Sequence, residues 1–137
     1  MNSDDIIASA RSCLGTPFVH QGRLKGIALD CAGLLVCVAK DIGADYIDQQ
    51  GYSRTPYGDT LVSILDDQPC LERVSRDDMR AGDMLLMRFT GEPQHLAVFT
   101  GENVIHSYEA VGKVCEHILD DEWSRRIVGV YRFMETS

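Results

Sequence analysis

The residue with the clearest chemical setting in this sequence is Cys31, which stands between Asp30 and an apolar run, "CAGLLVCVAKDI". A thiol attacks only as its thiolate, and a free thiol ionises at about pH 8.5. The unpaired backbone N–H groups of a helix N-terminus favour the thiolate and can stabilise an oxyanion. We therefore expect Cys31 to be a nucleophile held partly as a thiolate. The alternative is a buried structural cysteine, which is the commoner role of a cysteine in a helix.

The neighbours of Cys31 give this expectation its context. Asp30 can cap the helix, and its carboxylate would oppose ionisation only if it pointed at the sulfur. We expect it to face the backbone or a substrate amine instead. Cys37 lies six residues further on, within the apolar helix, and fits a core position. The other cysteines, at positions 13, 70 and 115, have no comparable setting.

Two histidines are candidate partners for the thiol. His95 opens the β-prone run "HLAVFTG", and His106 lies in "NVIHSYEA". If "TGEN" at 100–103 is a tight turn, the two runs form a hairpin that brings these imidazoles together on adjacent strands. His106 could then fix the tautomer of His95, which is the arrangement of base and orienting residue in a thiol hydrolase. The alternative is that either histidine is only a half-buried strand residue.

The remaining histidines give weaker signals. His117 lies in the charged stretch "KVCEHILDDE", and we expect it to be exposed and inert. Cys115 and His117 resemble a metal-binding fragment, but no second pair with zinc spacing exists in the sequence. We therefore predict no metal site.

Two helices should precede the strands. The spacing of apolar residues predicts a helix over 3–14, capped by Ser3, and a second over 31–42, ended by Gly43. The segment 44–60 is rich in turn residues, and 60–66 could form a short helix.

The pattern changes after "RAGD" at 80–83. Short β-prone runs then follow one another: "MLLMRF", "HLAVFTG", "NVIHSYEA", "KVCEHI" and "IVGVYRF". Helices followed by a strand meander predict an α+β domain with helices packed on one antiparallel sheet. The last run, 127–133, is apolar enough to be a central strand. The length of 137 residues fits a single domain over 1–137.

Composition excludes several classes of protein. The net charge of −8 argues against nucleic acid as a partner, because phosphate binding needs a basic surface. No apolar run is long enough to cross a membrane, and the acidic start "MNSDDIIASA" is unlike a signal peptide. Five cysteines without a CxxC pair make a disulfide framework improbable, so we expect synthesis in the reducing cytoplasm.

Three motifs in order, "LDCAGLL", "RAGDMLLM" and "HLAVFTGENVIHSYE", resemble the NlpC family of cell-wall cysteine peptidases. The resemblance runs over nearly the whole chain and implies a papain-like fold. It implies that Cys31 is the nucleophile, His95 the general base and acid, and His106 the residue that orients His95. It also implies cleavage of the amide between D-glutamate and a diamino acid in peptidoglycan stem peptides, without a cofactor. The stretch "GTPFVHQGR" is most similar to the subgroup found in phage tails and gene-transfer particles.

The sequence departs from the family pattern at two positions. Where the family often has a tyrosine whose hydroxyl assists the oxyanion hole, this chain has Phe18; His20 or Gln21 could supply a donor instead. The serine that often follows the cysteine is Ala32 here. Loss of one oxyanion donor costs about 10²–10³ in rate, so reduced activity is one expectation.

Three interpretations therefore stay open. The first is a peptidoglycan hydrolase, either carried by a phage tail to the cell envelope with other tail proteins as partners or acting in the cytoplasm on recycled wall peptides. The second is a structural or assembly component of a phage tail that keeps the peptidase fold but has lost the catalytic activity. The third is a related amidase or acyl transferase that uses the same cysteine and histidine.

Overall fold

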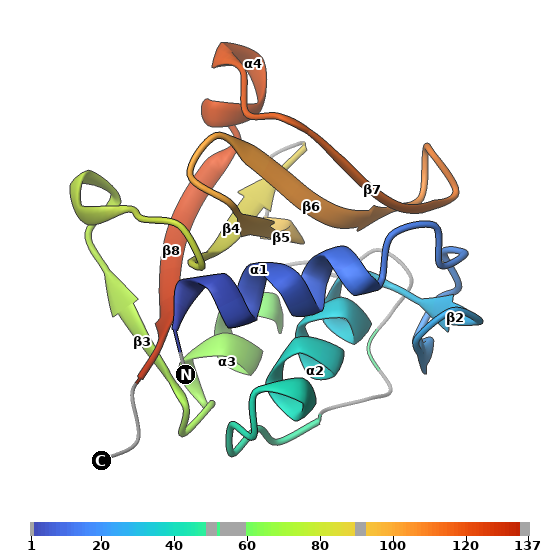
Figure 1. Ribbon diagram of the computed structural model, residues 1–137. Helices are drawn as coiled ribbons and strands as arrows, with labels where there is room; N and C mark the ends of the chain where they lie inside the picture. Colours follow the sequence, from blue (N-terminus) through green and yellow to red (C-terminus); the bar gives the residue numbers. More distant parts are fainter. Residues whose placement is uncertain (1, 49–51, 53–59, 90–92, 135–137) are drawn as a thin grey trace.

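A six-stranded antiparallel sheet forms the centre of the molecule (Figure 1). The computed structural model describes residues 2–48, 52, 60–89 and 93–134. The strand order is β3-β8-β4-β5-β6-β7. The bounds are β3 Leu71–Val74, β4 Met84–Arg88, β5 Pro93–Phe99, β6 Asn103–Tyr108, β7 Lys113–Ile118 and β8 Ile127–Phe133. A separate two-stranded sheet joins β1 Arg23–Leu24 to β2 Ala28–Leu29.

The expected α+β class is confirmed, and β8 pairs with neighbours on both sides, as its apolar sequence predicts. The strands β1, β2 and β3 were not predicted. The first two have two residues each, and β3 reads "LERV", in which one residue of four is buried. Strands this short and this exposed carry almost no alternating pattern.

Helices α1 Ser3–Ser12, α2 Cys31–Asp41 and α3 Thr60–Asp66 lie on one side of the sheet, whereas α4 Asp121–Ser124 lies on the other side (Figure 1). A short 3-10 helix spans Arg76–Asp78. The expected helices are present near their predicted bounds. The cap of α1 was predicted wrongly: Asn2, not Ser3, accepts the capping hydrogen bond, from the Asp5 N–H at 2.9 Å. Because Asn and Ser are equally good caps, sequence alone does not choose between adjacent candidates.

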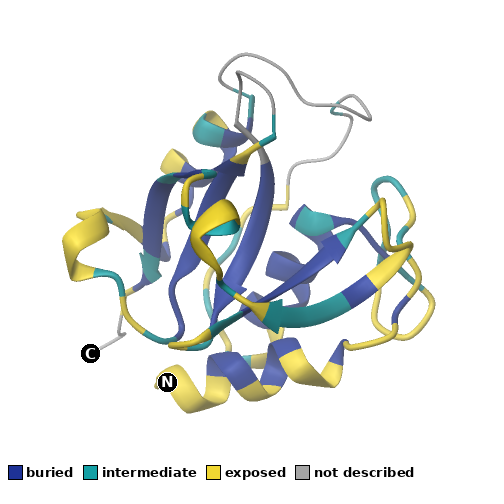
Figure 2. Cartoon of the chain, turned by 90° about the horizontal axis from the view of Figure 1, so that it is seen from above, coloured by how far each residue is buried: buried dark blue, intermediate teal, exposed yellow. Residues whose placement is uncertain are grey.

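The two faces of the sheet bury different residues. Leu96 and Val98 point toward the helices and belong to the larger core, together with Leu34 and Leu35 of α2. Ala97 and its alternating neighbours on β5 point the other way, toward a smaller cluster completed by Trp123 of α4. Figure 2 shows that the strands are largely buried while α1 exposes its outer side. Along β5, odd-numbered and even-numbered residues therefore serve opposite faces of the sheet.

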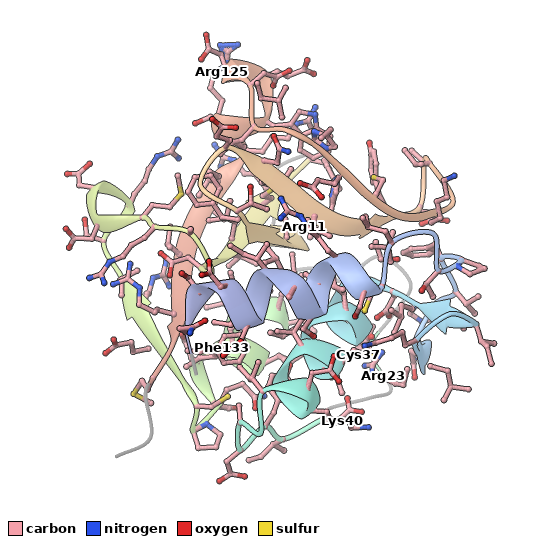
Figure 3. All side chains as sticks on the ribbon, viewed as in Figure 1. Arg11, Arg23, Cys37, Lys40, Arg125 and Phe133 are labelled. Carbon is pink, nitrogen blue, oxygen red and sulfur yellow. The ribbon has the colours of Figure 1, made fainter. Side chains whose placement is uncertain are left out.

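Side-chain contacts tie the layers together at the edge of the sheet. Arg11 reaches from α1 toward the outer strands (Figure 3) and forms an ion pair with Glu116 of β7 at 3.0 Å. Ser107 of β6 donates to the backbone oxygen of Leu29 at 2.6 Å, just before α2 begins. The start of α2 is therefore fixed against the same part of the sheet that carries the histidines.

The described residues contain no helix long and apolar enough to cross a bilayer.

Candidate active site

Cys31 is the first residue of α2, as the sequence predicts. Asp30 caps the helix: its backbone is extended, and its Oδ1 accepts a hydrogen bond of 2.7 Å from the Gly33 N–H. The carboxylate therefore faces the backbone, one of the two orientations expected for it. The thiol is half-buried, in contrast to Cys37 on the same helix, which is buried among the core residues.

Glycines at positions 22 and 33 let a loop pack against the first turn of α2. A Cβ on Gly33 would lie 2.1 Å from the backbone oxygen of Gly22, and a Cβ on Gly22 would meet the backbone of Ala28 at 2.6 Å. Neither contact leaves room for a side chain. The loop that precedes β1 is therefore held against the N-terminus of α2 and next to Cys31.

The electrostatic setting of Cys31 differs from the expected one. Burial is the largest effect on its pKa, followed by the charge of Asp30, and together they raise it to about 12. Hydrogen bonds from the backbone N–H groups of Leu96 and Ala32, and the charge of Arg23, act in the opposite direction but do not prevail. The expectation of a partial thiolate is therefore wrong for this state of the protein, because desolvation outweighs the helix N-terminus.

The hydrogen bond from Leu96 places the thiol against β5. Leu96 follows His95, and the hydrogen-bonded register between β5 and β6 includes only Val98 with Ile105 and Phe99 with Val104. The two strands therefore stop pairing before they reach residue 96. The thiol takes up the backbone N–H of Leu96 at the point where they separate.

The predicted hairpin of β5 and β6 brings the two histidines together. Its turn is closed by hydrogen bonds between Thr100 and Asn103, and Gly101 adopts the left-handed conformation that the turn requires. Nε2 of His95 lies 2.5 Å from Nδ1 of His106, and both rings are buried. Because Nε2 of His95 is engaged in this way, Nδ1 is the ring atom left for the thiol or a substrate.

His117 is neither exposed nor isolated, so the prediction for it was wrong. It is half-buried on β7, and its Nε2 lies 2.8 Å from Nε2 of His106. Its Nδ1 lies 2.9 Å from the backbone oxygen of Ile118. The register explains the error: Val104 opposes His117 and Cys115 opposes His106, so His117 lies diagonally across from His106 on the same face. The charged stretch around it gave no signal of this pairing.

Aromatic rings enclose the imidazoles. Tyr108 stacks on His106 with ring centroids 5.2 Å apart, and Phe89 lies 5.1 Å from His95. Trp123 of α4 meets His106 edge-on at 5.1 Å. This wall keeps water from the rings, so burial lowers the pKa of His106 to about 3 and that of His95 well below its usual value. Both imidazoles are neutral bases near pH 7.

Asp30 is the centre of a second network that includes two residues not predicted from sequence, Arg23 and Tyr52. Arg23 Nη1 lies 3.0 Å from Oδ1 of Asp30, and the Tyr52 hydroxyl donates to Oδ2. The backbone N–H of Gln21 also donates to Oδ2, at 2.8 Å. Arg23 ends the stretch "GTPFVHQGR", and Tyr52 belongs to a turn-rich stretch without periodicity. No pattern in the sequence links residue 52 to residue 30.

The predicted substrate-binding or oxyanion residues lie in the loop beside α2. Phe18 and His20 are half-buried, and Phe18 forms a bridge with Leu29. The His20 ring lies edge-on to Tyr52, with centroids 5.5 Å apart. The side-chain amide of Gln21 donates to the backbone oxygen of Tyr52 at 3.0 Å. Their contribution to an oxyanion hole stays a prediction.

Within the described part of the chain, no group of three or more His, Cys, Asp or Glu residues is placed to hold a metal ion. Each of the five cysteines is a free thiol.

Comparison with known proteins gives a family and a fold. Residues 15–132 match the model of the NlpC/P60 family. A search of curated proteins found no significant match. Among solved structures, an NlpC/P60 family protein from Bacillus cereus ATCC 10987 is 22% identical with a TM-score of 0.72; the alignment covers 98% of this chain and 41% of that one. The chain thus spans less than half the length of that protein.

Two further structures have the length of this chain. The NlpC/p60 domain of the peptidoglycan hydrolase SagA is 22% identical, with a TM-score of 0.67 and coverage of 98% of this chain and 100% of that one. RipD from Mycobacterium tuberculosis, described as a non-catalytic NlpC/p60 domain protein adapted to peptidoglycan binding, is 16% identical with a TM-score of 0.62 and 97% coverage of both chains. The same fold therefore occurs in a hydrolase and in a non-catalytic protein.

Proposed function

Because the chain belongs to the NlpC/P60 family, we propose that it is a cysteine peptidase that hydrolyses an amide bond in peptidoglycan stem peptides. The bond is the one between D-glutamate and the diamino acid. Cys31 is the nucleophile, His95 the general base and acid, and His106 the residue that orients His95. This assignment rests on the residues of this chain, because similarity to solved structures at about 20% sequence identity shows only a shared fold.

One observation carries the proposal: the thiol of Cys31 accepts a hydrogen bond from the N–H of the residue after His95, and His95 is hydrogen-bonded to His106. The start of α2 is thus tied to β5 next to His95, and β5 and β6 carry the paired histidines. A nucleophile beside a base that is itself oriented by a third group is the general signature of covalent catalysis.

In the first half of the reaction, the thiol is neutral at rest and loses its proton only as it attacks. Nδ1 of His95 takes that proton while Sγ of Cys31 bonds to the substrate carbonyl carbon. The backbone N–H groups at the start of α2 stabilise the oxyanion that forms. His95 then returns the proton to the leaving amine, the C–N bond breaks, and a thioester remains on Cys31.

In the second half, the same imidazole takes a proton from water. The hydroxide formed attacks the thioester, the C–O bond forms, and the C–S bond breaks. The proton returns to sulfur, so the products are an acid, an amine and the unchanged enzyme. A base that is neutral near pH 7 suits both halves, and the low pKa of buried His95 keeps it neutral.

The test is hydrolysis of purified muropeptides, read by mass spectrometry, with Cys31→Ala and Cys31→Ser beside the native protein. Both variants should release no product, while Cys70→Ala, a change at a buried cysteine in another part of the chain, should keep the native rate. Cleavage by either Cys31 variant would overturn the assignment. Mass spectrometry also separates hydrolysis from acyl transfer, because a transferase would give an adduct with an added amine.

A second function, peptidoglycan binding without hydrolysis, is favoured by the departures at Phe18 and Ala32. RipD is described as a non-catalytic domain adapted to binding. Native protein that binds muropeptides but releases no product would support this function.

Association with a phage tail and action at the cell envelope are further parts of the proposal. The stretch "GTPFVHQGR" supports them. Mass spectrometry of purified particles from a producing strain would detect the chain together with tail proteins; its absence from particles that contain every other tail component would contradict this part.

A further inference from the structure

The three histidines of the sheet form a hydrogen-bonded chain that ends on a backbone carbonyl. Nε2 of His95 lies against Nδ1 of His106, and Nε2 of His106 lies against Nε2 of His117. At the far end, Nδ1 of His117 lies 2.9 Å from the oxygen of Ile118. The reaction described above uses the first two rings but gives no role to the third.

The carbonyl at the end of the chain sets the direction of every bond in it. A carbonyl oxygen only accepts, so Nδ1 of His117 carries its hydrogen and Nε2 is an acceptor in the neutral ring. His106 must therefore donate through Nε2, which leaves its Nδ1 as an acceptor. His95 then donates through Nε2, and its Nδ1 holds a free electron pair. One backbone oxygen thus fixes three tautomers in sequence.

We propose that His117 is a positioning residue: it fixes the tautomer of His106 and thereby presents Nδ1 of His95, rather than Nε2, as the base for Cys31. The inference rests on the proposed function for its catalytic meaning, but the tautomers themselves are a property of the resting protein. His117 touches neither the thiol nor the carbonyl to be attacked, so it acts entirely through the ring of His106.

The surroundings of His117 hold its ring in place. Trp123 of α4 packs against it with ring centroids 4.9 Å apart, and the Arg126 guanidinium lies over Trp123 at 4.9 Å. On β6 and β7, the same face also carries Cys115, which opposes His106, Tyr108, which stacks on His106, and Lys113, which opposes Tyr108. The charge of Arg126 lowers the pKa of His95, and Arg126 is itself paired with Glu122 at 3.2 Å.

The need for such a device follows from the choice of orienting residue. An ionised carboxylate can only accept a hydrogen bond from His95, so it fixes the tautomer of His95 alone. A histidine has two ring nitrogens that exchange the roles of donor and acceptor. His106 therefore orients His95 only if something else fixes its own tautomer, and His117 is the group in contact with its other nitrogen.

The first measurement uses the unaltered protein. Two-dimensional 15N NMR of histidine side chains, near pH 7, reports which ring nitrogen carries hydrogen. We expect His95 and His106 as Nε2–H tautomers and His117 as the Nδ1–H tautomer. Finding His95 with its hydrogen on Nδ1 would overturn the proposal, whether or not the protein hydrolyses peptidoglycan.

The second measurement compares His117→Leu with His117→Gln. Leucine offers no acceptor to His106, so we expect mixed tautomers at His95 and a loss of kcat of about tenfold with KM unchanged. The glutamine side-chain oxygen can accept from Nε2 of His106 and should restore both the single tautomer and at least a third of the native kcat. Glu116→Gln, on the same strand but with its side chain paired to Arg11, is the matched control and should change neither.

The outcomes distinguish the two proposals. If Cys31 variants abolish hydrolysis but His117→Leu keeps the native tautomer at His95 and the native kcat, the role of His117 is wrong and the proposed function stands. If no form hydrolyses muropeptides but His117→Leu mixes the tautomers of His95, the positioning role stands and the peptidase assignment fails. A His117→Leu variant that does not fold leaves the NMR of the native chain as the deciding result.

Discussion

Arg23 and Asp30 form an ion pair beside the nucleophile, with Nη1 of Arg23 3.0 Å from Oδ1 of Asp30. Only 11% of the Arg23 side chain and 5% of the Asp30 side chain are exposed. Asp30 raises the pKa of Cys31, and Arg23 lowers it. The pair therefore holds the loop against α2, and Arg23 offsets part of the effect of Asp30 on the pKa of the thiol.

Replacing Arg23 with methionine should reduce the free energy of unfolding by about 3 kcal/mol, because it leaves a buried carboxylate without its cation. It should also raise the pKa of Cys31 further. Urea denaturation measures the first effect and the pH dependence of thiol alkylation the second. Arg23→Met combined with Asp30→Asn should recover much of the stability, since an asparagine still caps α2 and carries no charge. Equal stability of Arg23→Met and the native protein would show that the pair is not needed.

The pH dependence of activity should reflect a neutral thiol and a neutral base. Burial holds the pKa of His95 well below 6.5, so kcat/KM should stay constant as the pH falls through 6.5 and decline only in more acidic solution. The pKa of Cys31 is about 12, so alkylation of this thiol should accelerate about tenfold per pH unit between about pH 7 and 10. Initial rates of hydrolysis test the prediction for kcat/KM, and iodoacetamide labelling tests the prediction for alkylation of Cys31. An alkylation rate that reaches its plateau near pH 7 would indicate a preformed thiolate instead.

The same burial makes stability depend on pH in a definite direction. The pKa of His106 is about 3 in the folded protein and close to 6.5 in the unfolded chain, so the unfolded state binds the proton first. Its contribution is fully present above about pH 6.5 and is lost progressively as the pH falls toward 3. Between pH 7 and 5 this amounts to about 2 kcal/mol. Urea denaturation at both values measures it, and His106→Asn should remove that part of the pH dependence; an unchanged difference would contradict the assignment.

Much of this arrangement could be predicted from the sequence because its signals are local. The cap at Asp30, the periodic apolar residues of α2 and the turn between β5 and β6 each depend on a few neighbouring residues. Together they place Cys31 at a helix start and His95 beside His106. The prediction of a hairpin needed no more than one short turn between two β-prone runs.

The residues that escaped prediction depend on contacts between distant segments. His117 reaches His106 only through the register of β6 and β7, and Tyr52 reaches Asp30 across a turn-rich stretch. The ionisation of Cys31 was predicted wrongly for a related reason. The helix N-terminus is visible in the sequence, but the burial that outweighs it comes from packing between α2 and the sheet.

Phe18 offers a direct test of the departure from the family pattern. Phe18→Tyr adds one hydroxyl to a half-buried ring in the loop beside α2. If that hydroxyl reaches the oxyanion, kcat should rise about tenfold or more with KM unchanged, because an oxyanion donor acts in the transition state and not in substrate binding. Muropeptide hydrolysis followed over a range of substrate concentrations measures both constants. Phe89→Tyr, which adds a hydroxyl to a ring on the histidine side, is the control and should not raise kcat. A fall in KM without a gain in kcat would place the new hydroxyl in substrate binding and leave the oxyanion to the backbone at the start of α2.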